Sequence, residues 1–412
     1  MAYETALRDD ARRRLEEIGH ADIVVGIPSY NNAGTIGHVV QMAAQGMVTY
    51  FPDLKPVLMN SDGGSQDGTR ETVLSTPVPD GVEVIATVYQ GIPGKGSAFR
   101  AIFEAAQRLG ARVCVVVDSD LRSITPEWIE LLAGPVVKKG FGYVTPFYTR
   151  HKYDGTITNN ICYPMTRMLY GVDVRQPIGG DFGFSGALLD VYLAQDVWES
   201  DVARFGIDIW MTTTAINQDM RVCQAHLGAK IHDPKDPAAA LGPMFRQVVG
   251  TLLGLMATYE RRWQGVDQVR PTEMYGTPKA IEPEPVLVSL SKMIEKFQTG
   301  VAEHAAVLQA ALSSDIWRRV EEAARRSPEE FGFPADLWVD VLFDCAVAFN
   351  KGGLDRTALL DAMTPLYYGR TAGTVVEGTD MDTPTFEREI VQAQAKLFMQ
   401  RKPDLVRRWR GG

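Results

Sequence analysis

Two carboxylates, Asp118 and Asp120, directly follow the apolar run Val113 to Val117. A short run rich in β-branched residues predicts a buried strand, and polar residues at its end lie where open α/β sheets bind ligands. Mg²⁺ prefers oxygen ligands and usually takes only one or two of them from protein, with phosphates supplying others. The pair therefore fits a divalent cation that carries phosphates, although Asp and Ser are also common where a helix begins.

Four other segments in the N-terminal half combine polar residues with glycine. They are 26–32, 60–69, 93–96 and 176–183. In the third segment, glycines would let the backbone approach a phosphate, and Lys95 supplies a positive charge. Each segment alone is weak evidence, because glycine-rich turns are common and Asp62 or Asp67 could simply stabilise a turn. Their order and spacing together are more specific.

Strand-like and helix-like patterns alternate around these segments. The predicted strands are 23–27, 56–60, 82–88 and 113–117, and the predicted helices are 35–45, 67–74 and 97–109. This alternation predicts a doubly wound α/β fold with a mostly parallel, Rossmann-like sheet. In such a sheet the carboxyl ends of the strands share one edge, which would bring the polar segments together.

The pattern changes after residue 265. Helical periodicity without strand alternation covers 284–312, 315–326, 335–349, 356–368 and 384–402. Prolines at 271, 278, 283 and 285 predict a linker before these helices. We therefore expect an α/β domain over 1–265 and a helical region over 266–412. The helical region is expected to serve packing and assembly, with a homodimer as the expected state.

The composition excludes several classes of protein. The chain has 412 residues, is 45% hydrophobic and carries a net charge of −9 without a basic run, so nucleic acid is not an expected partner. Its four cysteines are far apart, which predicts separate buried thiols in a reducing compartment. The first 20 residues are too charged for a signal peptide, and no apolar run approaches the roughly 18 residues of a membrane span. We expect a soluble, cytoplasmic protein.

The five segments resemble the GT-A class of nucleotide-sugar glycosyltransferases, in the family-2-like superfamily. Within that class they look like the retaining glucosyl-3-phosphoglycerate, glucosylglycerate and mannosylglycerate synthases. The resemblance covers about residues 22–250, and its specific motifs are Pro-Gly-Lys-Gly at 93–96, Asp-Ser-Asp-Leu at 118–121 and Gln-Pro-Ile-Gly-Gly-Asp at 176–181. It continues into 205–208 and 229–232.

The resemblance implies a site for a nucleoside diphosphate sugar. The residues expected to bind this donor are Pro28, Tyr30, Asn32, Asp62, Lys95, Asp118, Ser119, Gly179 and Gly180, with Ser29 in the same pocket. Asp62 would hold the base, Lys95 the nucleotide and its phosphates, and Asp118 the ribose or base side. Family-2-like enzymes often have Asn-Glu-Glu where this chain has Asn-Asn-Ala at 31–33, so the base stays open between UDP, GDP and ADP.

The resemblance also implies a divalent metal, Mg²⁺ or Mn²⁺, bound by Asp120 and His232. Asp181 would hydrogen-bond the hydroxyls of the donor sugar, where relatives usually have Glu, so glucose and mannose both stay open. Asp208 is a second acid expected near the sugar or the acceptor. The alternative for Asp208 is an acid in the first turn of a helix. Asp120, Asp181 and Asp208 are the expected catalytic residues.

The expected acceptor segment is 150–158. In mannosylglycerate synthases an Arg, an Asp and a Thr at these offsets hold the glycerate, and they match Arg150, Asp154 and Thr158. A guanidinium suits a carboxylate because it can donate two parallel hydrogen bonds. The phosphoglycerate enzymes carry a phosphate-binding Arg where this chain has Thr156. The resemblance therefore favours D-glycerate over 3-phosphoglycerate as the acceptor.

Taken together, the resemblance implies metal-dependent, retaining transfer of glucose or mannose to a glycerate-type acceptor, giving a glycosylglycerate of the compatible-solute type. One alternative is transfer to another acceptor, such as a polyprenyl phosphate. Another is a sugar-nucleotide-binding or nucleotidyltransferase-like protein. Nucleotidyltransferases usually open with a glycine-rich loop followed by Arg and Lys, whereas the corresponding turn here is Ser-Tyr-Asn-Asn at 29–32.

Overall fold

The computed structural model describes residues 3–231, 237–279 and 283–411. The chain forms two compact units, each assembled from three stretches. The first unit contains Met1–Thr149, Val174–Lys235 and Thr272–Pro283, and the second contains Arg150–Asp173, Asp236–Pro271 and Glu284–Gly412. The units therefore do not separate at the predicted boundary of 265, because Arg150–Asp173 and Asp236–Pro271 cluster with the C-terminal helices.

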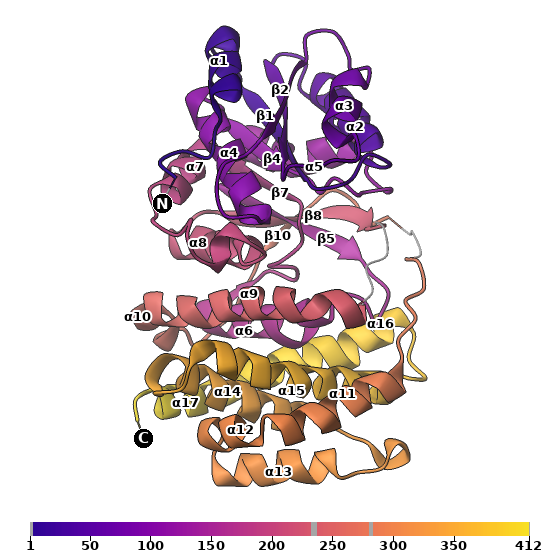
Figure 1. The fold of residues 1–412 in the computed structure, drawn as a ribbon, viewed down its shortest axis with the longest axis vertical. Helices are drawn as coiled ribbons and strands as arrows, with labels where there is room; N and C mark the ends of the chain where they lie inside the picture. Colours follow the sequence, from indigo (N-terminus) through magenta and orange to yellow (C-terminus); the bar gives the residue numbers. More distant parts are fainter. Residues whose placement is uncertain (1–2, 232–236, 280–282, 412) are drawn as a thin grey trace. The chain divides into compact units, whose positions relative to one another are not determined.

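The described part of the first unit is built on an eight-stranded sheet (Figure 1). In sheet order the strands are β10 (Glu273–Tyr275), β8 (Val222–Ala229), β5 (Tyr143–Thr149), β7 (Phe182–Ser185), β4 (Val113–Val116), β1 (Ile23–Ser29), β2 (Pro56–Asp62) and β3 (Glu83–Val88). Strand β7 is antiparallel to β4 and β5, and the other neighbours are parallel. The mostly parallel, GT-A-like α/β fold predicted from the sequence is confirmed.

Helices cover both faces of this sheet. They are α1 (Asp9–Ile18), α2 (Ile36–Tyr50), α3 (Thr69–Ser75), α4 (Lys95–Arg108), α5 (Pro126–Lys139), α7 (Gly186–Leu193) and α8 (Ile207–Asn217). Helices α2, α3 and α5 lie to one side of the strands, and α4 and α7 to the other (Figure 1). Every residue of β1, β2 and β4 is buried, as expected for parallel strands covered on both faces.

The packing of α4 onto β1 depends on Gly26. A Cβ at this position would overlap the side chain of Ile102 in α4, so the small residue lets the helix approach the strand closely. The sheet order places β2 on one side of β1 and β4 on the other. The order of the strands thus reverses beside β1, and ligands of open α/β sheets bind at such a point, outside the carboxyl ends of the strands.

The proline-punctuated stretch is more than the predicted linker. Glu273–Tyr275 forms β10, which pairs with β8 at the edge of the large sheet. Arg270–Pro271 forms β9, which pairs with β6 (Val172–Asp173) in a small two-stranded sheet. Pro271 is compatible with this pair because proline is tolerated at strand ends and edges.

The second unit is helical, and this confirms the predicted helical C-terminal region. Its α-helices are α6 (Tyr163–Tyr170), α9 (Pro237–Thr258), α10 (Glu260–Gln264), α11 (Leu290–Glu303), α12 (Ala305–Ala311), α13 (Ser314–Ala324), α14 (Ala335–Lys351), α15 (Arg356–Glu377), α16 (Thr383–Phe386) and α17 (Ala393–Trp409). It also contains two π-helices, η1 (Thr158–Cys162) and η4 (Glu387–Gln392), and the 3₁₀ helix η3 (Pro328–Glu330). Among the described helices, none has the length and apolarity to cross a membrane. The four cysteines are free and buried.

Candidate functional site

The predicted polar segments of the first unit meet at the carboxyl edge of the sheet. Strand β1 ends at Ser29 and β2 at Asp62, and these two residues are register partners. Strand β4 ends at Val116, so Asp118 and Asp120 follow it directly at the same edge. The strands thus place three of the predicted motifs side by side.

Asp118 lies between two lysines. Its Oδ1 is 2.9 Å from the ammonium of Lys95, at the start of α4, and its Oδ2 is 2.7 Å from the ammonium of Lys230, which follows β8. Burial alone would raise the pKa of Asp118, but the charges of Lys230 and Lys95 outweigh burial and hold the pKa well below its ordinary value. Burial likewise opposes the charge of Lys95, and Asp118 and Asp208 reverse that effect, so the pKa of Lys95 is raised. Asp118 and Lys95 are therefore both charged at neutral pH.

Asp181 is completely buried beside this pair. Its Oδ1 accepts a hydrogen bond from the backbone N–H of Asp118 at 2.8 Å. Its Oδ2 accepts from Lys230 at 2.9 Å and from the hydroxyl of Tyr148. Burial is the largest influence on the pKa of Asp181 and raises it, against the opposing charge of Lys230. Contact with a donor sugar stays a prediction, and it would require one of these bonds to give way.

The Gly179-Gly180 turn fits tightly against the cluster. Gly180 has a φ of +88°, and a Cβ there would overlap Oδ2 of Asp118 and approach the ammonium of Lys230. Its N–H donates to Oδ2 of Asp208 at 2.9 Å. Asp208 therefore satisfies both interpretations of the sequence, because it lies in the first turn of α8 and also 3.4 Å from the ammonium of Lys95.

The glycines of the 93–96 motif have a packing role that was not expected. A Cβ on Gly94 would lie 2.6 Å from the carbonyl oxygen of Ala203, and one on Gly96 would overlap that of Val202. The N–H of Gly96 donates to the carbonyl of Arg204 at 3.1 Å. These glycines therefore admit the neighbouring backbone of the 3₁₀ turn η2 (Asp201–Ala203), and the approach of the loop to a phosphate stays a prediction.

Asp62 organises the turn that follows β2. Its buried carboxylate accepts hydrogen bonds from the Ser29 hydroxyl at 2.6 Å, the Gly64 N–H at 2.8 Å, and the Ser65 N–H and hydroxyl at 2.6 and 2.7 Å. The base-holding role of Asp62 stays a prediction. In this structure its four acceptor positions are filled by the turn.

The β1 end of the site combines a fixed amide with an open aromatic ring. Oδ1 of Asn32 accepts from the N–H of Tyr30 at 3.0 Å and from the hydroxyl of Ser119 at 2.9 Å, which ties this turn to the end of β4. Tyr30 itself is 65% exposed, and the ring is therefore accessible to a ligand. Pro28 is buried in β1 opposite Ser61, where it contributes backbone shape and no polar group.

Only part of the predicted metal site can be described. Asp120 is buried at the sheet edge, whereas His232 lies outside the described residues. The segment before it is fixed, because Ile231 accepts from the N–H of Arg122 at 2.8 Å and donates to the Ser123 hydroxyl at 2.9 Å. Within the described ranges, no group of three or more His, Cys, Asp or Glu could hold a metal. One carboxylate still fits Mg²⁺, which binds through few protein ligands plus substrate phosphates.

The four predicted acceptor residues lie together in one turn of the second unit. Arg150 forms an ion pair with Asp154 at 2.8 Å, and the hydroxyl of Thr156 is hydrogen-bonded to that of Tyr367 in α15. Thr158 begins η1 and is buried. Contacts within the segment and with α15 therefore order it, and its acceptor role stays a prediction.

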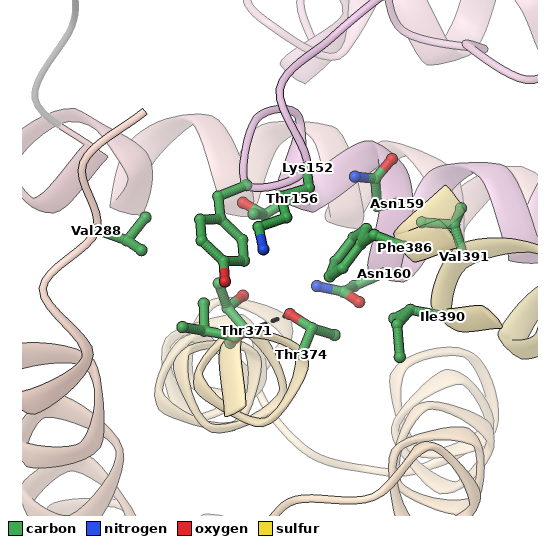
Figure 2. Close-up of a pocket in the computed structure, with 12 residues that line it drawn as sticks. Lys152, Thr156, Asn159, Asn160, Val288, Thr371, Thr374, Phe386, Ile390 and Val391 are labelled. Atoms are coloured by element: carbon green, nitrogen blue, oxygen red, sulfur yellow. Dashed lines mark hydrogen bonds between the residues drawn. The ribbon is translucent and has the colours of Figure 1, made fainter. Parts of the chain in front are cut away.

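The inner side of this turn borders a small cavity (Figure 2). Lys152, Thr156 and Asn159 line it together with side chains of α15, α16 and η4. Its volume of about 10 Å³ has room for roughly one water molecule, far less than a glycerate. The ammonium of Lys152 donates to three backbone carbonyls, those of Gly378, Thr379 and Met381, at 2.8, 3.1 and 2.6 Å.

Two residues of the cluster were not identified from the sequence, namely Lys230 and Tyr148. Lys230 belongs to the segment 229–232 that resembles the family, but it was not assigned a role. Both follow from the pairing of β8 with β5, which is parallel from Tyr143 to Thr149. The position of Lys230 in the family-like segment 229–232, between Ala229 and His232, is the sequence signal that could have found it.

Part of the chain matches a known protein family. Residues 24–198 match the family model of glycosyl transferase family 2. No curated protein gives a significant match. Similar solved structures include glucosyl-3-phosphoglycerate synthase from Mycobacterium tuberculosis with Mg²⁺ and uridine diphosphate, at 23% identity and a TM-score of 0.44 over 61% of this chain and 84% of that one.

The same M. tuberculosis enzyme with Mn²⁺, uridine diphosphate glucose and phosphoglyceric acid gives 23% identity and a TM-score of 0.44, over 61% of this chain and 85% of that one. The family model covers the start of α4 with Lys95, the end of β4 with Asp118 and the turn that carries Asp181. Residues 24–198 thus match glycosyl transferase family 2, and the chain is a glycosyltransferase.

Proposed function

We propose that this enzyme transfers a hexose, glucose or mannose, from a nucleoside diphosphate sugar to a glycerate-type acceptor, with retention of configuration and with Mg²⁺ or Mn²⁺. The observation that carries this proposal is the buried charge cluster at the carboxyl edge of the sheet. The cluster combines two lysines with three carboxylates: Lys95, Lys230, Asp118, Asp181 and Asp208.

Lys95 is the residue that best suits the donor's diphosphate. Its ammonium lies 2.9 Å from Asp118 and 3.4 Å from Asp208, and its side chain keeps 16% of its surface exposed. A diphosphate carries more charge than either carboxylate and would compete for this ammonium. Charge-assisted hydrogen bonds from Lys95 would then strengthen as the diphosphate departs, which is where a transferase needs stabilisation.

The residues that would hold the metal are Asp120 and His232, with the donor's phosphates completing the coordination. When bound, the metal would supply a Lewis acid that neutralises charge on the leaving diphosphate. The position of Asp120 directly after β4, at the same edge as Asp118, supports this assignment.

The buried carboxylates favour positioning over covalent catalysis. Asp181 is fully buried and accepts hydrogen bonds from Asp118, Lys230 and Tyr148, so it is not presented as a nucleophile. We therefore propose attack on the same face from which the diphosphate leaves, guided by that leaving group. The enzyme's contribution would then be orientation of donor and acceptor together with electrostatic stabilisation.

The preferred acceptor in this proposal is D-glycerate. Arg150 supplies the guanidinium for the carboxylate, and Thr156 provides no charge for a phosphate. Lys152 is the other cation that we considered for a phosphate. Its ammonium already donates to three carbonyls of the 378–381 segment, which supports excluding it from phosphate binding.

Acceptor choice is tested by measuring kcat/KM for D-glycerate and 3-phosphoglycerate with UDP-, GDP- and ADP-linked sugars. A missing Arg–phosphate contact costs about 1.5–3 kcal/mol, so D-glycerate should be preferred by roughly 10- to 150-fold. Thr156→Arg should narrow this gap. Thr156→Val is the matched control, because it also loses the bond to Tyr367 but adds no charge.

Arg150→Ala should raise the KM for glycerate far more than the KM for the nucleotide sugar. A wild-type preference for 3-phosphoglycerate would overturn the proposed acceptor. Transfer to neither acceptor, with the donor still hydrolysed, would leave the glycosyltransferase assignment intact and move the proposal to another acceptor class.

A further inference from the structure

The two lysines that contact Asp118 differ in how completely they are engaged. The ammonium of Lys230 lies 2.7 Å from Oδ2 of Asp118, 2.7 Å from the carbonyl of Gly179 and 2.9 Å from Oδ2 of Asp181. A lysine has three N–H donors, so these three acceptors use all of them. The side chain of Lys230 is only 5% exposed.

Contacts on several sides also restrict the movement of Lys230. The next residue, Ile231, is hydrogen-bonded on both sides to the loop after Asp120, at Arg122 and Ser123. The ammonium lies 5.2 Å from the centre of the Tyr148 ring, and the space beside it is so tight that Gly180 has no room for a Cβ. Reorientation of Lys230 toward a ligand would break several of these contacts at once.

Lys95 has fewer partners than Lys230 and is more exposed. It has two carboxylate partners at 2.9 and 3.4 Å, and its side chain is about three times as exposed as that of Lys230, at 16% against 5%. Both partners are side chains, so the ammonium can exchange one carboxylate for another anion without disturbing a backbone turn. The structure therefore separates a fixed lysine from an exchangeable one on the same aspartate.

We propose that Lys230 is a positioning residue that, paired with Asp181, fixes the Asp118 carboxylate for the nucleoside part of the donor, whereas Lys95 leaves Asp118 for the diphosphate. This inference rests on the proposed nucleotide-sugar site. It assigns Asp181 to the support of Lys230 and Asp118, in addition to any contact with sugar. The pair holds Oδ2 of Asp118, so that Oδ1 keeps one orientation when Lys95 departs.

The decisive variant is the double substitution Lys230→Met with Asp181→Asn. It removes one positive and one negative charge, so the net charge of the cluster and its long-range attraction for a diphosphate are unchanged. It also avoids a buried unpaired charge, which is strongly destabilising. The amide oxygen introduced by Asp181→Asn can still accept from the N–H of Asp118, and the amide N–H₂ then faces the Tyr148 hydroxyl, which can accept from it.

The experiment first uses calorimetry to find which of UDP, GDP and ADP binds wild-type enzyme most tightly in the presence of Mg²⁺. The dissociation constants of that diphosphate and of its parent nucleoside are then compared across variants, with the weak nucleoside measured by competition. The double variant should bind both ligands about tenfold more weakly, because it disturbs a contact that the two ligands share. Lys95→Met should weaken the affinity for the diphosphate by about 10- to 100-fold and the affinity for the nucleoside by less than about twofold.

Two results would overturn the positioning role. If the double variant loses affinity only for the diphosphate, Lys230 is a phosphate ligand. If its affinity for both ligands is unchanged, Lys230 and Asp181 have only a packing role. Lys230→Gln combined with Asp181→Asn is also neutral in net charge and keeps an N–H donor for the Asp118 carboxylate, so it gives the same comparison if the first double variant does not fold. Lys138→Met is the control, since Lys138 pairs with Glu130 at 3.1 Å on α5. Failure of all three diphosphates to bind wild-type enzyme would instead overturn the nucleotide site itself.

Discussion

The ammonium of Lys95 lies 2.9 Å from Oδ1 of Asp118 and thereby joins the beginning of α4 to the end of β4. In the sequence these residues belong to two separate motifs. In the structure each is the counter-ion of the other before any ligand binds. A pair of this kind keeps both groups charged in a buried place, and a phosphate can then replace the carboxylate as the partner of the lysine.

Gly180→Ala should weaken donor binding. The substitution places a methyl group against Oδ2 of Asp118 and also forces an alanine to adopt a φ of +88°. Gly81→Ala separates these two effects, because Gly81 has a φ of +85° and a Cβ added there would meet nothing within 4 Å. Calorimetry with nucleoside diphosphate should show at least about a tenfold loss for the first variant only. Equal affinities in the two variants would contradict the close contact.

Asp62→Ala should destabilise the first unit even without nucleotide. It leaves four hydrogen-bond donors of Ser29, Gly64 and Ser65 without their buried acceptor. We expect the free energy of unfolding in urea to fall by about 2–4 kcal/mol, because each unsatisfied buried group costs about 1–3 kcal/mol before relaxation. Asp62→Asn keeps an acceptor oxygen and should lose less. A change below about 0.5 kcal/mol in the alanine variant would show that the turn does not depend on Asp62.

Asp120→Ala and His232→Ala should each reduce turnover by at least about a hundredfold, the scale on which lost transition-state charge stabilisation is felt. The reason is loss of the proposed metal ligands. Activity should be measured after treatment with a chelator and again with added Mg²⁺ or Mn²⁺. Wild-type enzyme should lose activity and regain it, whereas the variants should stay low. Full activity of either variant in chelator would rule out that residue as a ligand.

Lys402 gives a pH dependence in the second unit. Its ammonium donates to the carbonyls of Met168 and Val266 at 2.8 and 2.7 Å, and burial lowers its pKa to about 7 from 10.5. Between these values the unfolded chain binds the additional proton, so this lysine makes stability rise with pH across that window and contributes no slope below it.

The direction of this change of stability with pH is checked with Lys402→Met, which removes the titrating group. The free energy of unfolding of wild-type protein relative to the variant should increase from pH 7 to pH 10, by about 1.4 kcal/mol for each pH unit while the folded form stays neutral. The lost carbonyl contacts give the variant a constant offset, so the slope is the quantity to read. Parallel curves for the two proteins would contradict a lowered pKa.

Several strands of the first unit could be predicted because their local sequence pattern matches their burial in the folded protein. The apolar run before Asp118 is a buried strand in the structure, and the strands that end at Ser29 and Asp62 also lie where alternation placed them. The strands after residue 117 were not predicted. Strand β7 is only four residues long and contains Gly183, and its antiparallel pairing with β4 is a tertiary feature.

The sequence predicted which residues meet at the candidate site better than it predicted their contacts. Lys95, Asp118, Asp181 and Asp208 do meet, since strand ends and helix starts share one edge of the sheet. The pairing of the buried Asp181 with Lys230 was not predictable, because it joins the turn before β7 to the end of β8. Nor did the sequence reveal that Gly94 and Gly96 face the backbone of η2, because that contact joins segments about a hundred residues apart.

The central claim is tested most directly by proton NMR of the reaction of wild-type enzyme with α-linked UDP-glucose, GDP-glucose, ADP-glucose and GDP-mannose. Each donor is supplied with D-glycerate and with Mg²⁺ or Mn²⁺, and with the Lys95→Met and Lys138→Met variants in parallel. We predict that the anomeric signal of one donor declines while an α-glycoside signal appears, with loss of this activity in Lys95→Met only. A β-linked product, or no consumption of any donor by folded wild-type enzyme, would contradict the account.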